Sequence, residues 1–166
     1  MWDYIEECFK SSPKRKEIAS LFLVLGLSCR DDNKVYCQDI EVPVKKIADS
    51  IGIDRRVVNE TVKDILSHDR LRQVFGGLKP RAFLRDSAAA LDWGVIEIEA
   101  CPETVGIVAG VASLIAGEDI SIRQVVADDP NLFPQPKLTI VTEQKIPSEL
   151  FEKILNIEGV LKVSIY

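Results

Sequence analysis

The hydrophobic pattern of this chain changes period near residue 90, and this change limits the possible folds more than any other feature. Before it, apolar residues recur at helical spacing, as in residues 18–25. After it the period is two, so that Ile96 and Ile98 fall on one face of a strand and Glu97 and Glu99 on the other. We therefore expect an α+β protein with a helical first half and a sheet in its second half.

The length of 166 residues is compatible with one core or with two small domains. A composition that is 46% hydrophobic and 28% charged is ordinary for globular proteins and argues against a disordered, collagen-like or coiled-coil chain. From the change of period we expect two domains. The first is helical and covers residues 1–86, a linker covers residues 87–92, where SAAAL is interpreted as a short helix or linker, and the second domain covers residues 93–166.

Charge is distributed unevenly along the chain, although its net value is −5. Residues 1–90 carry 16 Lys and Arg against 14 Asp and Glu, whereas residues 91–166 carry 5 against 12. The chain as a whole repels a polyanion. A contact with nucleic acid therefore requires a local basic face in the first half.

The cysteine and histidine content gives no sign of a metal, a cofactor or an active site. The four cysteines are scattered without a CxxC pair, and one histidine, His68, does not complete a zinc site with them. Buried structural thiols are the favoured interpretation, and a catalytic Cys/His dyad is the alternative. Asp128 and Asp129 precede a proline and are typical of a turn rather than of a catalytic carboxylate pair. We expect a protein that is not an enzyme.

The chain also lacks the marks of a membrane or exported protein. No stretch reaches the about 18 apolar residues that a bilayer span needs. The start, MWDYIEECFK, has no basic region followed by an apolar one. We expect a soluble, cytoplasmic protein with no membrane partner.

Two short helices with a glycine turn between them are predicted in the first half. A helix after Pro43 ends at Gly52, and Asp54 is a good N-cap for the next helix. The stretch VKKIADSIGIDRRVVNETVKDIL, residues 44–66, resembles the helix-turn-helix family. The resemblance rests on a small residue at the helix crossing, a turn glycine, an apolar turn residue and two buried positions: Ala48, Gly52, Ile53, Val58 and Val62.

The second of these helices carries hydrogen-bonding side chains that suit the major groove of DNA. Arginine pairs with guanine edges and asparagine with adenine, and lysines on the preceding helix reach phosphates. The candidate DNA-binding residues are Lys45, Lys46, Arg55, Arg56, Asn59, Glu60 and Lys63. The alternative is an ordinary solvated helix face.

Two further segments of the first half carry weaker signals. Residues 28–39, SCRDDNKVYCQD, have little periodicity and are expected to form a loop. Residues 70–85 hold five basic residues and no acidic one, with Gly76 and Gly77 between short apolar segments. They are interpreted either as a β-hairpin wing beside the recognition helix or as a basic connector.

The second half predicts six elements in the order βαββαβ. The strands are expected near residues 95–100, 120–127, 138–142 and 160–166, and the helices near residues 107–115 and 147–156. This order is typical of a ferredoxin-like sandwich, with two helices on one face of a four-stranded sheet.

Within this order, ETVGIVAGVASLIAGEDISI, residues 103–122, resembles the ACT domain, a small-molecule regulatory module of amino-acid metabolism. Glu103 stands at the acidic position of that family, Gly106 at its first glycine, and Ile120 and Ile122 at its Ile-x-Ile pair. The chain departs from the family at three points. Val105 replaces a proline, Asp119 replaces a glycine and has to adopt a left-handed conformation, and the acid is one methylene longer.

The ACT resemblance implies an effector site between two copies of the chain. In that family an amino acid lies where residues 103–107 of one subunit face residues 119–124 of its neighbour. The implied effector-binding residues are Glu103, Thr104, Val105, Gly106, Ile107, Asp119, Ile120, Ser121, Ile122 and Gln124. The alternative is a sandwich that serves dimerisation alone.

Taken together, the two halves resemble archaeal regulators of amino-acid metabolism that join an N-terminal helix-turn-helix to a C-terminal ACT domain. The stretches RQVVADDP and PKL add to that likeness. The resemblance implies a homodimer, with a tetramer also open, in which an amino-acid effector changes the separation of two DNA-binding helices. The alternative is a regulatory or assembly subunit that senses a metabolite and docks on a metabolic enzyme.

Overall fold

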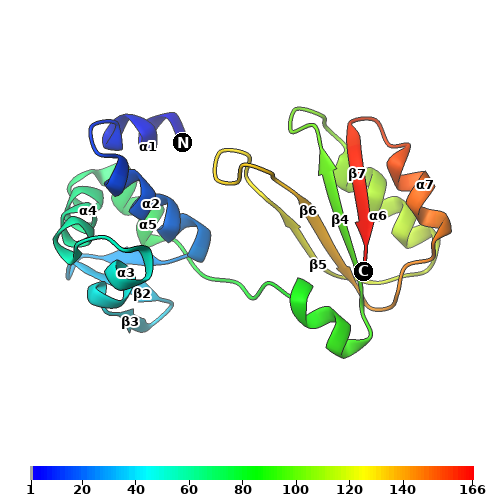
Figure 1. The fold of residues 1–166 in the computed structure, drawn as a ribbon, viewed down its shortest axis with the longest axis horizontal. Helices are drawn as coiled ribbons and strands as arrows, with labels where there is room; N and C mark the ends of the chain where they lie inside the picture. The colour runs from blue at the N-terminus through cyan, green and yellow to red at the C-terminus, as the bar shows by residue number, and fades with distance from the viewer. Residues whose placement is uncertain (1) are drawn as a thin grey trace. The chain divides into compact units, whose positions relative to one another are not determined.

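The computed structural model of the chain describes residues 2–166 and divides into two compact units between Ala82 and Phe83 (Figure 1). The protein is of the α+β type, as expected. Residues 87–92, expected as a linker or short helix, lie within the second unit, where most of them belong to a 3-10 helix, η1 (Arg85–Leu91). Among the helices of residues 2–166, none combines the length and hydropathy that a bilayer span requires.

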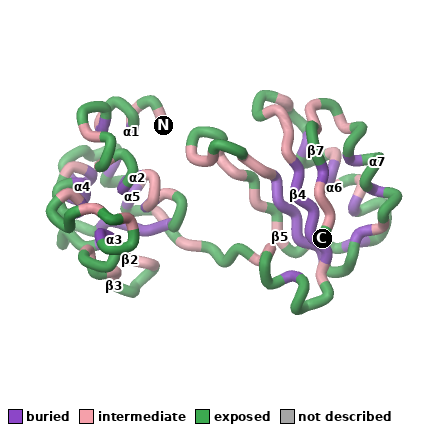
Figure 2. Tube along the Cα trace, viewed as in Figure 1, coloured by how far each residue is buried: buried purple, intermediate pink, exposed green. Residues whose placement is uncertain are grey.

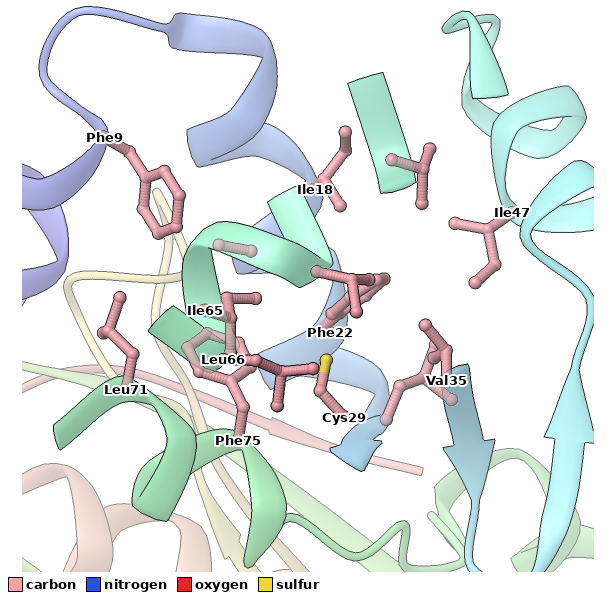
Figure 3. Close-up of a cluster of buried hydrophobic side chains, with 14 of the residues drawn as sticks. Phe9, Ile18, Phe22, Cys29, Val35, Ile47, Ile65, Leu66, Leu71 and Phe75 are labelled. Carbon is pink, nitrogen blue, oxygen red and sulfur yellow. The ribbon is translucent and has the colours of Figure 1, made fainter. Parts of the chain in front are cut away.

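The first unit packs five helices around a small sheet. Its elements are α1 (Trp2–Phe9), α2 (Pro13–Leu25), β1 (Ser28–Arg30), β2 (Lys34–Cys37), β3 (Ile40–Val42), α3 (Val44–Ile51), α4 (Arg55–Ser67) and α5 (Asp69–Gly76). Figure 3 shows side chains from these helices and strands pointing toward one another, with Phe22, Ile65 and Phe75 fully buried.

The expectation of a loop over residues 28–39 was wrong, because the chain forms an antiparallel sheet there in the order β1-β2-β3. The first turn bends at Asn33, whose φ is 61°. The strands are only three or four residues long. In the first two of them, Cys29 and Val35 are buried in the core of the unit. Because so few of their side chains are buried, these strands show almost no alternation of apolar and polar residues in the sequence.

The β-hairpin wing considered for residues 70–85 was also wrong. Residues 69–76 form α5, and the chain then runs without regular structure to Leu84. Leu71 and Phe75, four residues apart, are both buried, so helical packing decides the local structure. The glycines at 76 and 77 end a helix rather than turn a hairpin.

The two helices predicted around Gly52 are present. Gly52 ends α3 in a left-handed conformation with a φ of 65°. The Asp54 carboxylate accepts a hydrogen bond of 2.7 Å from the backbone N–H of Arg56 and so caps α4, as predicted. Ala48, Val58 and Val62 are buried, as the pattern indicated.

The second unit has the predicted βαββαβ order. After η1 it contains β4 (Gly94–Ala100), α6 (Ile107–Gly117), β5 (Ile122–Ala127), β6 (Leu138–Thr142), α7 (Glu149–Leu155) and β7 (Val160–Ile165). The sheet order is β5-β6-β4-β7 with antiparallel neighbours, which is the split βαβ arrangement.

The two faces of this sheet are covered differently. Ile98 and Ile140 point to α6 and α7 and belong to the main core of the unit. On the opposite face, Val95 and Val141 pack against Ala88 of η1. Figure 2 shows how fully the central strands are buried between these layers.

Candidate functional site

One side of α4 carries polar side chains that are exposed. Arg56, Asn59 and Lys63 follow one another at spacings of three and four residues, so they form a single stripe, and Arg55 lies beside it. Among residues 2–166 the side chains of Arg55, Arg56 and Lys63 make no salt bridge. On the other side of the helix, Val58 and its apolar neighbours hold α4 in the core. The core contacts therefore fix the helix backbone that carries the stripe.

Glu60, expected to lie on this stripe, is engaged elsewhere. The Arg15 guanidinium of α2 binds the carboxylates of both Glu60 and Asp64. These two acids are four residues apart and form the edge of α4 that faces α2. Arg15 offsets one of the two negative charges on this edge, and the exposed stripe itself carries only basic and neutral side chains. Lys45 and Lys46 of α3 are exposed on the helix that packs beside α4.

The second unit has a small pocket beside the connection from β4 to α6. Its volume is about 180 Å³. The walls are mainly apolar, and the lining residues with polar side chains are Cys101, Thr104, Asp128 and Lys137. The lining residues are Ile98, Ala100, Cys101, Pro102, Thr104, Ile107, Val108, Ala127, Asp128, Pro130, Pro136, Lys137 and Leu138.

The pocket contains only part of the effector set expected from sequence. Thr104 and Ile107 line it. Glu103 is exposed, Val105 is 94% exposed, and Gly106 takes a φ of 91° at the start of α6 with open space where a Cβ would lie. A Cβ at residue 106 would therefore not clash within this chain. The positive φ is the feature that favours glycine at this position.

The other half of the expected set lies at the opposite end of the sheet. Ile122 pairs with Thr142, which also pairs with Gly94 at the start of β4, whereas the pocket lies near Ala100 at its end. Within one chain, residues 119–124 therefore do not meet residues 103–107. Asp119 has a φ of 55°, the left-handed conformation that its position required. The expected residues at this end are Asp119, Ile120, Ser121, Ile122 and Gln124.

Sequence reasoning missed the wall that comes from the β5–β6 connection. Asp129 accepts a backbone hydrogen bond from Asn131 and so acts in a turn, as interpreted. Asp128 instead accepts a backbone hydrogen bond from Lys137 at the far end of the β5–β6 connection. The available signal was the three prolines of residues 128–137, which fix the course of that connection.

A buried carboxylate, Glu97, lies on the face of the sheet opposite α6 and α7. It is 8% exposed and binds Arg85 Nε at 2.9 Å, Lys137 Nζ at 3.3 Å and the Tyr166 hydroxyl at 3.1 Å. The Arg85 guanidinium also lies over the Tyr166 ring, 4.8 Å from its centroid. Burial raises the pKa of Glu97, but the bonds from Arg85, Lys137 and Tyr166 lower it by more, so it stays charged.

Two further observations concern metal binding and the buried thiol of Cys29. Within residues 2–166 no group of three or more His, Cys, Asp or Glu side chains is arranged to hold a metal ion. Burial raises the pKa of the Cys29 thiol from its ordinary value of 9.0 to about 12. Compared with protein-family models and with curated protein sequences, the chain gives no match.

Proposed function

We propose that the protein is an amino-acid-responsive regulator whose first unit binds DNA through α4 and whose second unit binds the effector. The observation that carries the proposal is the exposed stripe of Arg56, Asn59 and Lys63, left without acidic partners because Arg15 takes Glu60 and Asp64. The resemblances of residues 44–66 to helix-turn-helix proteins and of residues 103–122 to ACT domains support the same function.

A helix that reads DNA needs one buried face and one face of donors and acceptors near its N-terminus. In α4 the capping bond from Asp54 fixes the first turn, where Arg55 and Arg56 lie. Lysines on α3 supply the phosphate contacts that position such a helix. Because the chain as a whole carries a net charge of −5, DNA binding has to be local to this surface. The phosphate contacts made by its Lys and Arg side chains would make that binding strongly dependent on salt.

The proposed effector is a small amino acid with an aliphatic or short polar side chain. Its carboxylate suits the free backbone N–H groups at the start of α6, and its ammonium suits Asp128 and the Thr104 hydroxyl. Apolar walls and a volume of about 180 Å³ favour a compact ligand.

We further propose that two chains pair through β5, the strand at one edge of the larger sheet. Residues of β5 alternate between half-buried and exposed, and Val125 is 42% exposed. An edge strand with an exposed apolar side chain is a ready template for a second copy. Pairing by this edge would bring residues 119–124 of one chain toward the partner. The effector site implied by the ACT resemblance needs these residues to face residues 103–107 of the partner.

The DNA proposal is tested by titrating the protein with a 30-bp duplex pool enriched for binding, over a range of salt. Replacing two cations in Arg55→Ala, Arg56→Ala is expected to weaken binding and to reduce the slope of log affinity against log salt by about 2. The matched control is Lys10→Ala, Lys14→Ala, which removes the same charge from exposed positions of the same unit. Equal binding by wild type and the α4 variant would refute the proposal.

The effector proposal is tested by thermal unfolding with each of the twenty amino acids. A ligand present at 100 times its dissociation constant adds about 2.7 kcal/mol of stability. Val108→Trp is expected to fill the pocket and abolish the response, because Val108 lines it and is 45% exposed. Ala109→Trp, exposed on the same helix and outside the lining, should keep the response. A panel with no response contradicts the proposal.

The second candidate function is a metabolite-sensing subunit that docks on an enzyme. The β2–β3 hairpin favours it, because Ile40 is 72% exposed between Asp39 and Glu41, a surface that suits a protein better than a polyanion. A chain that responds to an amino acid but shows no salt-dependent DNA binding supports this candidate.

A further inference from the structure

Two opposite charges face each other across the base of the β5–β6 connection without forming an ion pair. The backbone N–H of Asp128 donates to the carbonyl oxygen of Lys137 at 2.9 Å, and the backbone N–H of Lys137 donates to Asp128 Oδ2 at 3.1 Å. Residues opposed in this way have Cβ atoms about 5 Å apart, so a lysine ammonium can reach the carboxylate. Within residues 2–166, however, no salt bridge to Asp128 forms, and the Lys137 ammonium binds Glu97 instead.

Glu97 holds the Lys137 side chain on the face of the sheet opposite α6 and α7. Lys137 Nζ lies 3.3 Å from Glu97 Oε2, and the Glu97 side chain is only 9% exposed. Arg85 and the Tyr166 hydroxyl bind the same carboxylate and fix its position. Because water screens a buried carboxylate little, its attraction for an ammonium is stronger than that of a solvated one. The Lys137 ammonium is thereby committed to Glu97.

This arrangement decides the charge of the pocket beside the connection from β4 to α6. Of the described residues that line the pocket, only Asp128 and Lys137 carry charged side chains. Because Glu97 binds the Lys137 ammonium, the Asp128 carboxylate is the charge left to a ligand, among walls that are mainly apolar. A hollow that is lined by one sign of charge and has apolar walls attracts ions of the opposite sign.

We propose that Glu97 is a positioning residue for this pocket: by keeping Lys137 away from Asp128, it makes the pocket select ligands with an ammonium group and reject ligands with an acidic side chain. Without Glu97, Lys137 would neutralise Asp128, because the Lys137 backbone already binds that carboxylate. That the ligand is an amino acid rests on the proposed function, whereas the selection by charge does not. Applied to amino acids, the inference excludes aspartate and glutamate as effectors.

Modification of the Cys101 thiol, which is half-buried and lines the pocket, measures this charge in the full chain without a known effector. The probes are two methanethiosulfonates, one with a trimethylammonium group and one with a sulfonate, and peptide mass spectrometry follows each cysteine separately. The corrected ratio is the cationic rate over the anionic rate at Cys101, divided by the same quotient at Cys37 of the first unit. Glu97→Gln is expected to lower the corrected ratio at least about 5-fold, the effect of one unit charge about 4 Å away in water.

The matched control is Glu99→Gln, which removes the same charge from the same strand. The partner of Glu99 is Lys162, which does not line the pocket, and the Glu99 side chain is 35% exposed. Because solvent screens an exposed charge, the control should lower the corrected ratio by less than about 2-fold. Glu97→Asp serves if Glu97→Gln loosens the sheet: it keeps the net charge, withdraws the carboxylate from Lys137 by one methylene, and should also lower the corrected ratio.

A double-mutant cycle separates the release of Lys137 from the simple loss of a negative charge. Lys137→Met should raise the corrected ratio several-fold more in Glu97→Gln than in wild type, because only in Glu97→Gln is the ammonium free to reach Asp128. Equal effects in the two backgrounds, or an effect of Glu97→Gln no larger than that of Glu99→Gln, would overturn the proposal. An amino-acid panel with no response contradicts the effector proposal and leaves this measurement intact, whereas a responding panel with an additive cycle removes the inference about Glu97 alone.

Discussion

At the scale of single residues, Gly26 and Gly52 show how similar backbone conformations place different demands on the chain. Both end helices, with φ of 64° and 65°. A Cβ at 26 would meet the backbone of Lys79 and Pro80 at 2.7 Å, whereas a Cβ at 52 would meet nothing within 4 Å. The conformation is common to both sites, and the packing is not.

Gly52→Ala is therefore expected to cost about 1 kcal/mol of unfolding free energy, the price of a left-handed alanine. Gly26→Ala should cost about 1 to 3 kcal/mol more, because backbone atoms have to move to accept the methyl group. Chemical denaturation of both variants measures the difference. Equal losses of unfolding free energy in the two variants would mean that the backbone near Pro80 moves aside at little cost.

The buried thiol of Cys29 is expected to make the free energy of unfolding depend on pH in the alkaline range. Its pKa is raised by burial to about 12, against 9.0 for an ordinary thiol. The thiol thus stays protonated in the folded chain while the unfolded chain ionises, so its contribution is complete below pH 9 and is lost as pH rises toward 12. Cys29→Ala should be less stable than wild type at pH 7, and the difference should narrow at pH 10. A difference independent of pH contradicts this assignment.

At the scale of elements, what the sequence predicted depended on how much apolar surface each element buries. The strands β4 to β7 and the helices α3, α4 and α6 bury regular faces, and their order was predicted. The strands of residues 28–42 were missed because they are short and contribute few buried side chains. The alternating pattern placed Glu97 correctly on the face of the strand away from Ile96. Its burial depends on η1, and the sequence of η1 has no hydrophobic periodicity that predicts this packing.

The candidate sites divide along similar lines. The exposed positions of α4 follow from helical spacing and were predicted, whereas the engagement of Glu60 by Arg15 joins residues 45 apart and has no local signal. The same holds for the pocket wall from residues 127–138, which meets the start of α6 only through sheet pairing. Contacts between distant segments are what a single sequence leaves undetermined.

The attachment of η1 predicts a change of stability at acid pH. The pKa of Glu97 is lowered despite its burial, by bonds from Arg85, Lys137 and Tyr166. Its contribution is present above the ordinary carboxyl pKa of 4.5 and is lost as pH falls below it. Glu97→Gln should lose about 1.5 to 3 kcal/mol at pH 7, and the loss should shrink toward pH 3. Glu99→Gln serves as the control, and a loss that persists at pH 3 would count against the ionic bond.

At the scale of the whole molecule, two separate cores predict two unfolding transitions. The chain has one tryptophan in each unit, Trp2 packed on the first core and Trp93 on the cluster beneath η1. Trp93→Phe leaves fluorescence that reports the first unit, and Trp2→Phe leaves fluorescence that reports the second.

Phe75→Ala, which opens a cavity in the first core, should lower the stability reported by Trp2 by about 3 to 5 kcal/mol. The transition reported by Trp93 should not move, because none of its core contacts involve that residue. Denaturation of the two tryptophan variants with and without Phe75→Ala gives the measurement. A joint shift of both midpoints would show that the units unfold as one.

The close approach of Lys79 and Pro80 to Gly26 also bears on how this chain can be recombined with others. Gly26, which caps α2, lies against the backbone of Lys79 and Pro80, so the packing of the first unit extends beyond the end of α5 and includes Pro80. A chimera that grafts a foreign sensor after Pro80 inherits an intact junction, whereas one joined at Gly77 leaves the end of α2 uncovered.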